Sequence, residues 1–428
     1  MQAMIKKQIR KEKKMNLKGM VSAFAAMSAI LGGTGFVQPT YADVNVEDVK
    51  CTQRYPWNGL VDIEYTIACD DPEAEIYVNP VGFNGDTGLT VFPTHFTGDG
   101  ATNTVKAGRH TMVWDAKADL GNLFATKNFQ IKMYAGKKLS PYLVVDLSSG
   151  PDGDHFPIRH SLTSPDLSDD TCRTTELWLR LIPPGTFMMG SPTGELGRRD
   201  NEDLHKVTIT KPFYIGVFEV TYEQWYRVYG SWAYGTSSFA LYPVVDVSPN
   251  GYNTIGHDGS NQSFIGIIRA KTGMRGFHLP TEAQWEYACR LGTTTALNNG
   301  TNLDGVEGSV NLNLLGRYYA NGTQGVWNNS STAKVGSYKP NAYGIYDMHG
   351  NVFELCLDAY NESVNYHLGH SPCTDPVCDN WSGALIARGG CWNSGANACR
   401  SGLRDRFDAN GSSITTGFRL FCTGNFQQ

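Results

Sequence analysis

Short apolar runs separated by turn-forming residues are the feature that most restricts the fold of this chain. The clearest run, GLVDIEYTIAC over 59–69, alternates Ile63, Tyr65 and Ile67 with polar residues, which is the period of a half-buried strand. Clusters of Gly, Asn, Asp and Pro follow such runs, and the chain contains 47 glycines among its 428 residues. This pattern predicts strands, turns and aromatic-filled cores, not a helical bundle.

Length and charge narrow the classes of protein further. A chain of 428 residues is too long for one ordinary domain, so two or three domains are expected. The formal net charge of -5 excludes a general affinity for nucleic acid or anionic lipid, because there is no basic excess to neutralise phosphates.

Residues 1–42 are predicted to be a signal peptide. A basic segment containing Lys6, Arg10 and Lys18 precedes the apolar run MVSAFAAMSAILGGTGFV, and cleavage is expected after Ala42. Glycines shorten this run below a comfortable membrane span, so no membrane attachment is expected after cleavage. The mature chain is therefore predicted to be periplasmic or extracellular, where disulfides are the default state of its ten cysteines.

Residues 44–149 are predicted to form an all-β sandwich of the Ig or fibronectin type. The strand candidates after the first run are AEIYV, LTVF, HTMVW, FQIKMY and YLVVDL. Cys51 and Cys69 flank the turn PWNG, so a cross-strand disulfide is expected. The region contains no acid–base or ligand cluster, which favours a binding or spacer role.

The segment 150–171 is rich in Pro, Ser and Asp and lacks periodicity, so it is predicted to be a linker whose His155 and His160 are solvated. From Cys172 the pattern changes, and a second domain is predicted over 172–424, with helices that begin after Thr221 and Thr281.

The second of these helices has a clear start signal. Thr281 and Gln284 have the spacing of a capping box, in which each side chain bonds the other's backbone amide. Trp285, Ala288 and Cys289 then recur at helical spacing, so they are expected to face the core.

Seven motifs in the second half stand in the order in which one known family carries them. They are IPPGTFMMGS, HKVTITKPFYIGVFEVT, HLPTEAQWEYACR, PNAYGIYDMHGNVFEL, ARGGCW, CRSGLR and GFRL. The region from about Leu177 to Phe421 therefore resembles the formylglycine-generating enzyme (sulfatase-modifying factor) family. The resemblance implies an α+β, C-type-lectin-like fold, often with calcium. It also implies copper-dependent oxidation of a sulfatase cysteine to formylglycine by dioxygen.

The stretch DMHGNVFE has donor atoms suited to calcium. Asp347 and Glu354 supply carboxylates around the Gly350–Asn351 turn, and hard cations take about six to eight oxygens. The resemblance implies that these two side chains and the carbonyls of Gly350 and Val352 bind calcium. A capped turn is the alternative.

A second calcium site of the family would use an Asn that matches Asn321. The acid of that site falls near Trp327, where this sequence has none, although Asn328 and Asn329 are adjacent. The second site is therefore expected to be incomplete.

The stretch RGGCWNSGANACRSG departs from the family at its cysteines. Active members hold copper(I) with two cysteines five residues apart. Here the second is Cys399, the first falls on Ser394, and Cys391 takes a place usually held by serine. A hydroxyl is a hard donor that does not hold copper(I) at neutral pH, and the three-residue offset is expected to turn Cys391 to the opposite face of a strand. Both cysteines are therefore predicted to be buried thiols or disulfide partners.

The remaining candidates have structural interpretations. HLGHSPCTDPVC has zinc-like spacing of two His and two Cys, but a Cys373–Cys378 disulfide is favoured in an exported chain. Glu286 is expected to pair with Arg290 one helical turn away. Four motif arginines are predicted to bind loop carbonyls and carboxylates: Arg388, Arg404, Arg406 and Arg419.

The leading hypothesis is an exported two-domain protein whose second domain is similar to formylglycine-generating enzymes but lacks the complete copper pair. If active, it would be a copper-dependent oxidoreductase that acts on a cysteine of a sulfatase or another exported protein. The alternative is a non-catalytic lectin-like module that binds a protein or glycan ligand, or acts as a cell-surface component.

Overall fold

The computed structural model of the chain describes residues 44–55, 58–121, 128–233, 237–250, 253–256, 262–322, 332–360, 372–379 and 382–423. The signal peptide predicted over 1–42 lies outside these residues. None of the helices in this described part has the length and apolar composition that a membrane span requires.

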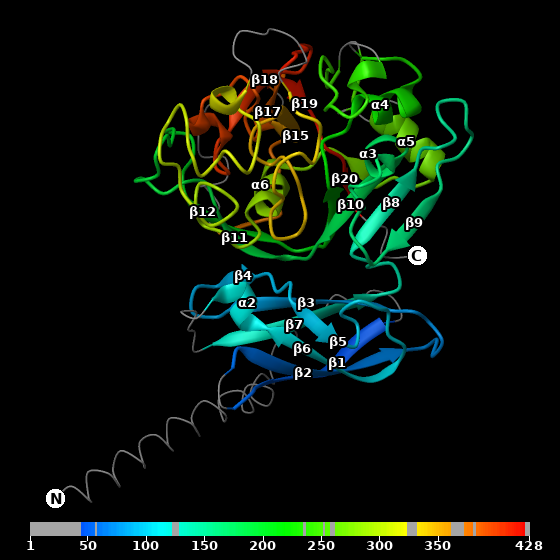
Figure 1. Cartoon of the computed structure of the whole chain (residues 1–428). Helices are drawn as coiled ribbons and strands as arrows, with labels where there is room; N and C mark the ends of the chain where they lie inside the picture. The colour runs from blue at the N-terminus through cyan, green and yellow to red at the C-terminus, as the bar shows by residue number, and fades with distance from the viewer. Residues whose placement is uncertain are drawn as a thin grey trace, which may run out of the picture.

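Two antiparallel sheets form the N-terminal part of the molecule (Figure 1). Ile63 and Tyr65 of one sheet share a core with Val78 and Ile131 of the other, as the alternation predicted. The first sheet contains, in order, β1 (Val44–Gln53), β2 (Leu60–Cys69), β6 (Gly108–Asp115) and β5 (Phe96–Gly98). The second contains β4 (Leu89–Val91), β3 (Tyr77–Asn84) and β7 (Phe129–Gly136), and the short helix α2 (Ala116–Leu120) follows β6.

A six-stranded sheet organises the rest of the chain. Its order is β14 (Phe277–His278), β20 (Phe421–Cys422), β13 (Phe213–Gly216), β10 (Glu176–Ile182), β8 (Tyr142–Asp146) and β9 (Ile158–Ser161). A three-stranded sheet contains β11 (Gly185–Met189), β12 (His205–Ile209) and β16 (Cys373–Thr374). A four-stranded sheet contains β18 (Asp405–Asp408), β17 (Ala384–Arg388), β15 (Phe353–Ala359) and β19 (Thr416–Gly417).

The α-helices of this part are short: α3 (Thr171–Thr174), α4 (Tyr222–Tyr229), α5 (Phe264–Thr272) and α6 (Glu282–Arg290). The described residues also form the 3-10 turns η1 (Ser237–Phe239), η2 (Tyr319–Asn321) and η5 (Ala396–Cys399).

The predicted starts of α4 and α6, at Thr221 and Thr281, are confirmed. Both helices begin with a complete capping box, formed by Thr221 with Gln224 and by Thr281 with Gln284. Trp285 faces inward with Ala288 and Cys289, and all three side chains are fully buried. Helix α6 packs against β11, β15 and β17, which places it at the centre of the C-terminal part.

The predicted boundary between the two parts is wrong. The run YLVVDL was assigned to the N-terminal sandwich, but its strand β8 pairs with β10 and β9 in the six-stranded sheet. Four successive residues of β8 are buried, as expected for a central strand covered on both faces. The N-terminal sheets therefore end with β7 at Gly136. Nor is 150–171 a free linker, because it supplies β9, on which His160 Nδ1 lies 2.6 Å from Ser140 Oγ.

The predicted Cys51–Cys69 disulfide is also wrong. Strands β1 and β2 pair so that Cys51 lies opposite Ile63, whereas Cys69 lies opposite Val44. The two cysteines are thus separated by about seven strand positions, or roughly 23 Å at 3.3 Å per residue, too far for a disulfide. In the described part of the chain, no two cysteines are joined by a disulfide.

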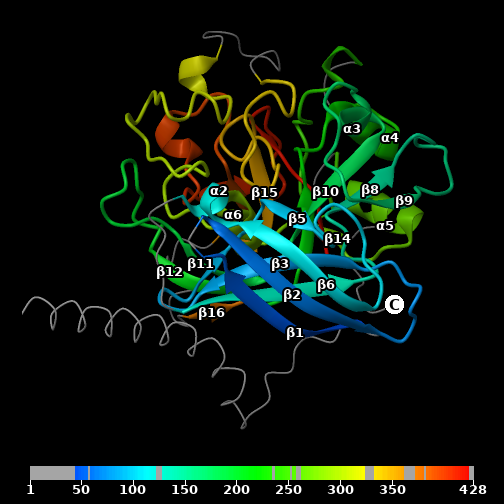
Figure 2. The same cartoon turned by 60° about the horizontal axis from the view of Figure 1, so that its bottom comes forward.

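The two parts contact each other along β4 and β11 (Figures 1 and 2). Phe92, which follows β4, packs edge-on against Tyr287 and Tyr343, with ring centroids 5.4 Å apart in both pairs. Thr90 Oγ1 accepts a hydrogen bond of 2.7 Å from the backbone amide of Thr186. An aromatic side chain of the N-terminal part therefore lies in the core of the C-terminal part.

Candidate functional site

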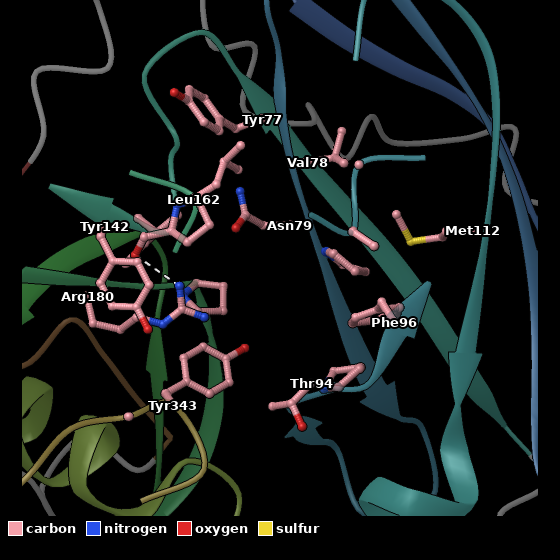
Figure 3. Close-up of a pocket in the computed structure, with 18 of the residues that line it drawn as sticks. Tyr77, Val78, Asn79, Thr94, Phe96, Met112, Tyr142, Leu162, Arg180 and Tyr343 are labelled. Carbon is pink, nitrogen blue, oxygen red and sulfur yellow. Dashed lines mark hydrogen bonds between the residues drawn. The ribbon is translucent and has the colours of Figure 1, made fainter. Parts of the chain in front are cut away.

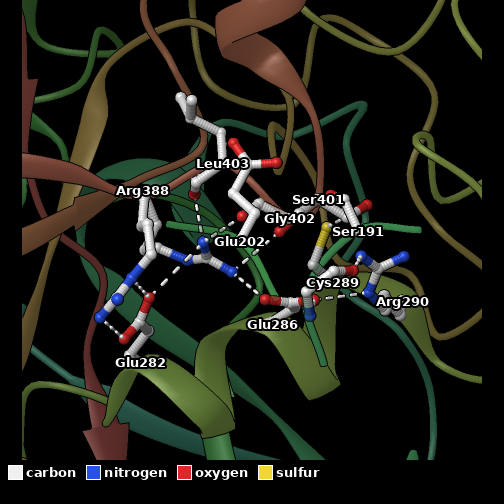
Figure 4. Close-up of polar contacts among 12 residues, drawn as sticks. Ser191, Glu202, Glu282, Glu286, Cys289, Arg290, Arg388, Ser401, Gly402 and Leu403 are labelled. Carbon is white, nitrogen blue, oxygen red and sulfur yellow. Dashed lines mark hydrogen bonds and ion pairs between the residues drawn. The ribbon is translucent and has the colours of Figure 1, made fainter. Parts of the chain in front are cut away.

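Helix α6 carries a buried ion-pair network, in which Figure 4 shows arginines on either side of its glutamates. Glu286 accepts from Arg290 Nε at 2.7 Å and from the amide of Gly190 at 2.8 Å, and it also pairs with Arg388. Arg404 donates to both oxygens of Glu282 at 2.8 and 2.7 Å. The pairing predicted for Glu286 and Arg290 is confirmed, and every carboxylate here already has a cationic partner.

Three of the four motif arginines bind loop carbonyls or carboxylates as predicted, and Arg404 binds the carboxylate of Glu282. Arg388 donates to the carbonyls of Ser401 at 2.8 Å and Gly402 at 3.1 Å, which ties the end of β17 to the following loop. Arg406 lies exposed on β18, because its strand position points away from the core, so the prediction for it is wrong. Sequence reasoning missed Arg400, which is fully buried and paired with Glu195 and Glu202.

The predicted calcium residues converge, but Glu354 is already engaged. Its oxygens accept from Trp285 Nε1 at 2.7 Å and from Arg419 Nε and Nη2 at 2.5 Å each. Asp347 Oδ2 accepts from the amide of Gly336 at 2.6 Å, whereas Asp347 Oδ1 is buried without a hydrogen-bond partner.

A third carboxylate, which the sequence did not indicate, completes this cluster. Glu219 accepts from Asn351 Nδ2 at 2.6 Å and from the amide of Val352 at 3.2 Å. Burial, followed by the charges of Asp347 and Glu354, raises the pKa of Glu219 well above its usual range. Burial likewise raises the pKa of Asp347 to about 6. A buried acid within the apolar run GVFEVT was the available signal.

The charges of this cluster bear on its fit to calcium. Three buried carboxylates face one guanidinium, that of Arg419, so the ionised cluster would carry a net charge of -2. Protons or a cation must offset that charge. The free oxygen of Asp347 suits a cation, but Glu354 is committed to Arg419. Within the described residues, no group of three or more His, Cys, Asp or Glu side chains is arranged to hold a metal ion. Any calcium here would therefore rely on Asp347 and backbone carbonyls, including those proposed at Gly350 and Val352.

Asn321, predicted for the second calcium site, stabilises its own turn. Its Oδ1 accepts from the amide of Tyr318 at 2.9 Å and its Nδ2 donates to the carbonyl of Gly316 at 2.9 Å. The positions proposed to complete that site, Trp327 to Asn329, lie outside the described residues, as do His367 and His370 of the zinc-like motif.

Cys391 and Cys399 are neighbours, contrary to the prediction that Cys391 would face away. Strand β17 ends at Arg388, and Gly389 and Gly390 follow with φ of 87° and 76°, so the alternation of a strand no longer applies. Cys391 Sγ lies 3.2 Å from Ser394 Oγ. Burial, and next the charge that Cys391 would carry, raises the pKa of Cys399 well above its usual range.

This thiol pair is closed to solvent. Cys391 is 3% exposed and Cys399 is 0% exposed, and burial also raises the pKa of Cys391. His349 links the loop that carries Cys399 to the backbone at Asn298. Its Nδ1 lies 2.7 Å from the carbonyl oxygen of Cys399, and its Nε2 accepts from the amide of Asn298 at 3.0 Å. The residues do not fit copper in the manner of the family, because position 394 offers a hydroxyl and the two thiols leave no surface for a substrate sulfur.

Comparison with known proteins identifies the C-terminal part. The family model described as "Sulfatase-modifying factor enzyme 1-like domain" matches residues 165–423, which is more than half of the chain. The chain belongs to this sulfatase-modifying factor family. The N-terminal sheets, with β8 and β9, lie outside the matched range.

Members and structures similar to this sulfatase-modifying factor domain carry several names. Chaperone protein LppX of Paenibacillus barcinonensis is 29% identical over 242 residues, which cover 49% of this chain and 79% of that protein. The formylglycine-generating enzyme of Thermomonospora curvata is 27% identical over 277 residues, which cover 56% of this chain and 91% of that protein. The structure of PvdO from Pseudomonas aeruginosa is 26% identical and covers 57% of this chain and 94% of its own, with a TM-score of 0.47.

Proposed function

We propose that this chain is an exported family member that retains the sulfatase-modifying factor scaffold without its oxidase chemistry and acts as a binding module. One observation carries the proposal: a hydroxyl stands at position 394, and the remaining thiols of Cys391 and Cys399 are closed in the core. A thiol that oxidises a partner's cysteine must be reached by that partner and must ionise readily. These two do neither.

The other parts of the proposal follow the sequence. The basic and apolar N-terminus supports export to a periplasmic or extracellular location. The N-terminal sheets are proposed to be a sandwich of the Ig or fibronectin type, within a protein whose other domain is C-type-lectin-like. A relative named as a chaperone protein is compatible with a binding role, and the proposed partners are exported proteins, sulfatases among them, or glycans.

Calcium is proposed as a structural ion of this module. Asp347, with the carbonyls of Gly350 and Val352, would hold it, and the bound ion would neutralise the buried carboxylates. Glu219 and Glu354 would not bind the ion directly. Glu219 positions the Gly350–Asn351 turn through its hydrogen bond with Asn351, and Glu354 stays paired with Arg419.

The oxidase is the second candidate, and the closeness of Cys391 to Cys399 favours it. Two sulfurs side by side are the donor set that copper(I) prefers. If the loop from Gly389 to Arg400 opened, this pair could replace the family pair.

A peptide oxidation assay separates the two candidates. The reduced chain without residues 1–42 would be loaded with copper(I) and incubated in air with a peptide that contains the sulfatase motif Cys-x-Pro-x-Arg. We expect no aldehyde above the level of a Cys399→Ala variant. Aldehyde formation that is lost in Cys399→Ala but retained in the matched variant Cys373→Ala would establish the oxidase and overturn the proposal.

A further inference from the structure

A cleft runs between the N-terminal sheets and the C-terminal part (Figure 3), and its lining includes no cysteine and no residue of the acidic cluster. Its volume is about 290 Å³. Both parts of the chain line it, with Phe96 and Met112 on one wall and Tyr142, Arg180 and Tyr343 on the other. Ligand sites in proteins measure about 300–1,000 Å³. This cleft lies at the lower end of that range, so it suits a ligand of one or two rings.

Arg180 on β10 is the only charged side chain that lines the described cleft, and two rings hold it in place. Its guanidinium carbon lies 4.9 Å from the ring centroid of Tyr142 and 4.7 Å from that of Tyr343. Arg180 Nη1 donates to the carbonyl of Pro141 at 2.9 Å. The side chain is therefore already ordered, and a ligand that binds it need not pay the usual cost of immobilising an arginine.

What Arg180 lacks is an anion. The buried arginines of the described C-terminal part each pair with a glutamate: Arg290, Arg388, Arg400 and Arg419. No carboxylate lies within ion-pair distance of Arg180 in the described part of the chain, and Arg180 Nε is buried without a partner. Its Nη2 has no acceptor among the described residues either. Figure 3 shows the guanidinium directed toward the space between the walls.

The remaining walls suit a ring with hydroxyl groups. Tyr77 and Phe96 present half-buried rings, and amphipathic ligands pack on such surfaces. Asn79 Nδ2 donates to the carbonyl of Leu139 at 2.9 Å, so its Oδ1 can accept from a ligand hydroxyl. Thr94 is exposed on the opposite wall, and because its hydroxyl donates to Asp119 Oδ1 at 2.5 Å, its oxygen can serve a ligand only as an acceptor.

We infer that this cleft binds a carboxylated sugar of one or two rings, with its carboxylate on Arg180 and its rings against the aromatic walls. A planar guanidinium matches a carboxylate better than any other cationic side chain does. The inference rests on the proposed binding role of the chain. It is nevertheless separable from the closed thiol pair, because the aldehyde assay does not involve the cleft.

Calorimetric titration of the full mature chain tests the inference. Digalacturonate is the probe, the uncharged disaccharide of galactose tests the need for the carboxylate, and the dipeptide Ala-Ala tests whether any carboxylate suffices. We expect binding of digalacturonate alone, weakened at least about tenfold in Arg180→Met, which is about 1.4 kcal/mol. Equal binding of either control compound, or no heat from digalacturonate at millimolar concentration, would overturn the inference.

Arg159→Met is the matched control variant. Arg159 also lies over an aromatic ring, that of Trp178 at 4.8 Å, but it pairs with Glu176 and does not line the cleft. The Arg159→Met variant should bind digalacturonate as tightly as the wild type does. An equal loss of affinity in Arg159→Met and Arg180→Met would contradict the assignment of the carboxylate to Arg180. Should Arg180→Met not fold, Tyr77→Ala provides the second test, and undiminished affinity in that variant would count against the cleft.

Discussion

Replacing Arg419 with glutamine should cost more stability than any other single change in the acidic cluster. The guanidinium is fully buried and makes four hydrogen bonds, two to Glu354 and one each to the carbonyls of Gly216 and Tyr346. Removing one partner of a buried ion pair leaves the other charge uncompensated, at a cost of about 3–5 kcal/mol. We expect a loss of about 4 kcal/mol near pH 7.5, a large part of the ~5–15 kcal/mol that stabilises most domains.

The same variant should show a distinctive pH dependence. Burial already raises the pKa of Glu219 well above its usual range and the pKa of Asp347 to about 6, and losing Arg419 raises both further. The folded variant then binds more protons than the folded wild type, so its deficit in unfolding free energy grows as pH rises and shrinks as pH falls. Each extra proton bound changes the deficit by about 1.4 kcal/mol per pH unit.

Urea unfolding followed by tryptophan fluorescence measures both effects. Arg159→Gln is the control, because its pair with Glu176 is half-exposed and should be worth less than about 1 kcal/mol. A loss below about 1 kcal/mol for Arg419→Gln at pH 7.5, or a deficit that increases toward pH 5.5, would refute this account of the cluster.

Three further outcomes follow from other sites. Burial raises the pKa of Asp358 to about 7, so this group lowers the free energy of unfolding as pH rises from about 4 to 7. In Asp358→Asn the urea midpoint should fall less steeply over this pH range, and an unchanged pH dependence would contradict the raised pKa of Asp358. Gly350 has φ of 87°, and a Cβ there would lie 2.1 Å from the carbonyl oxygen of Arg317. Gly350→Ala should therefore lower the free energy of unfolding by about 2 kcal/mol or more in chemical denaturation, and an unchanged free energy would contradict the described conformation of this turn. Millimolar calcium should raise the Tm of the wild type but not of Asp347→Asn, and equal shifts in both proteins would exclude Asp347 as a ligand.

Local signals in the sequence predicted the local structure well. The helix start at Thr221 and the capping box at Thr281 placed α4 and α6, and alternation along β2 identified its buried face. Helix α5 was missed, although Ser263 caps its start and Gly273 ends it in the left-handed conformation. Such signals act within a few residues of the chain, which is why they can be recognised without knowing the fold.

Features that depend on distant contacts were not predictable. Strand β8 joins β10 across more than thirty residues, and no nearby residue indicates which sheet it enters. The position of Cys391 depends on two glycines that turn the chain after β17, a conformation that an assumed strand hides. Glu219 lies more than a hundred residues from Asn351, so only the folded chain brings them together.

The closed thiol pair is tested most directly by alkylation of the reduced, native chain with iodoacetamide, followed by mass mapping of each cysteine. Half-buried Cys69 serves as the internal reference for a thiol with some solvent access. We expect Cys391 and Cys399 to remain unmodified until the chain is unfolded in urea, because both residues are buried in the native chain. Native-state labelling of Cys391 and Cys399 as fast as that of Cys69 would contradict this prediction and restore the oxidase as the leading candidate.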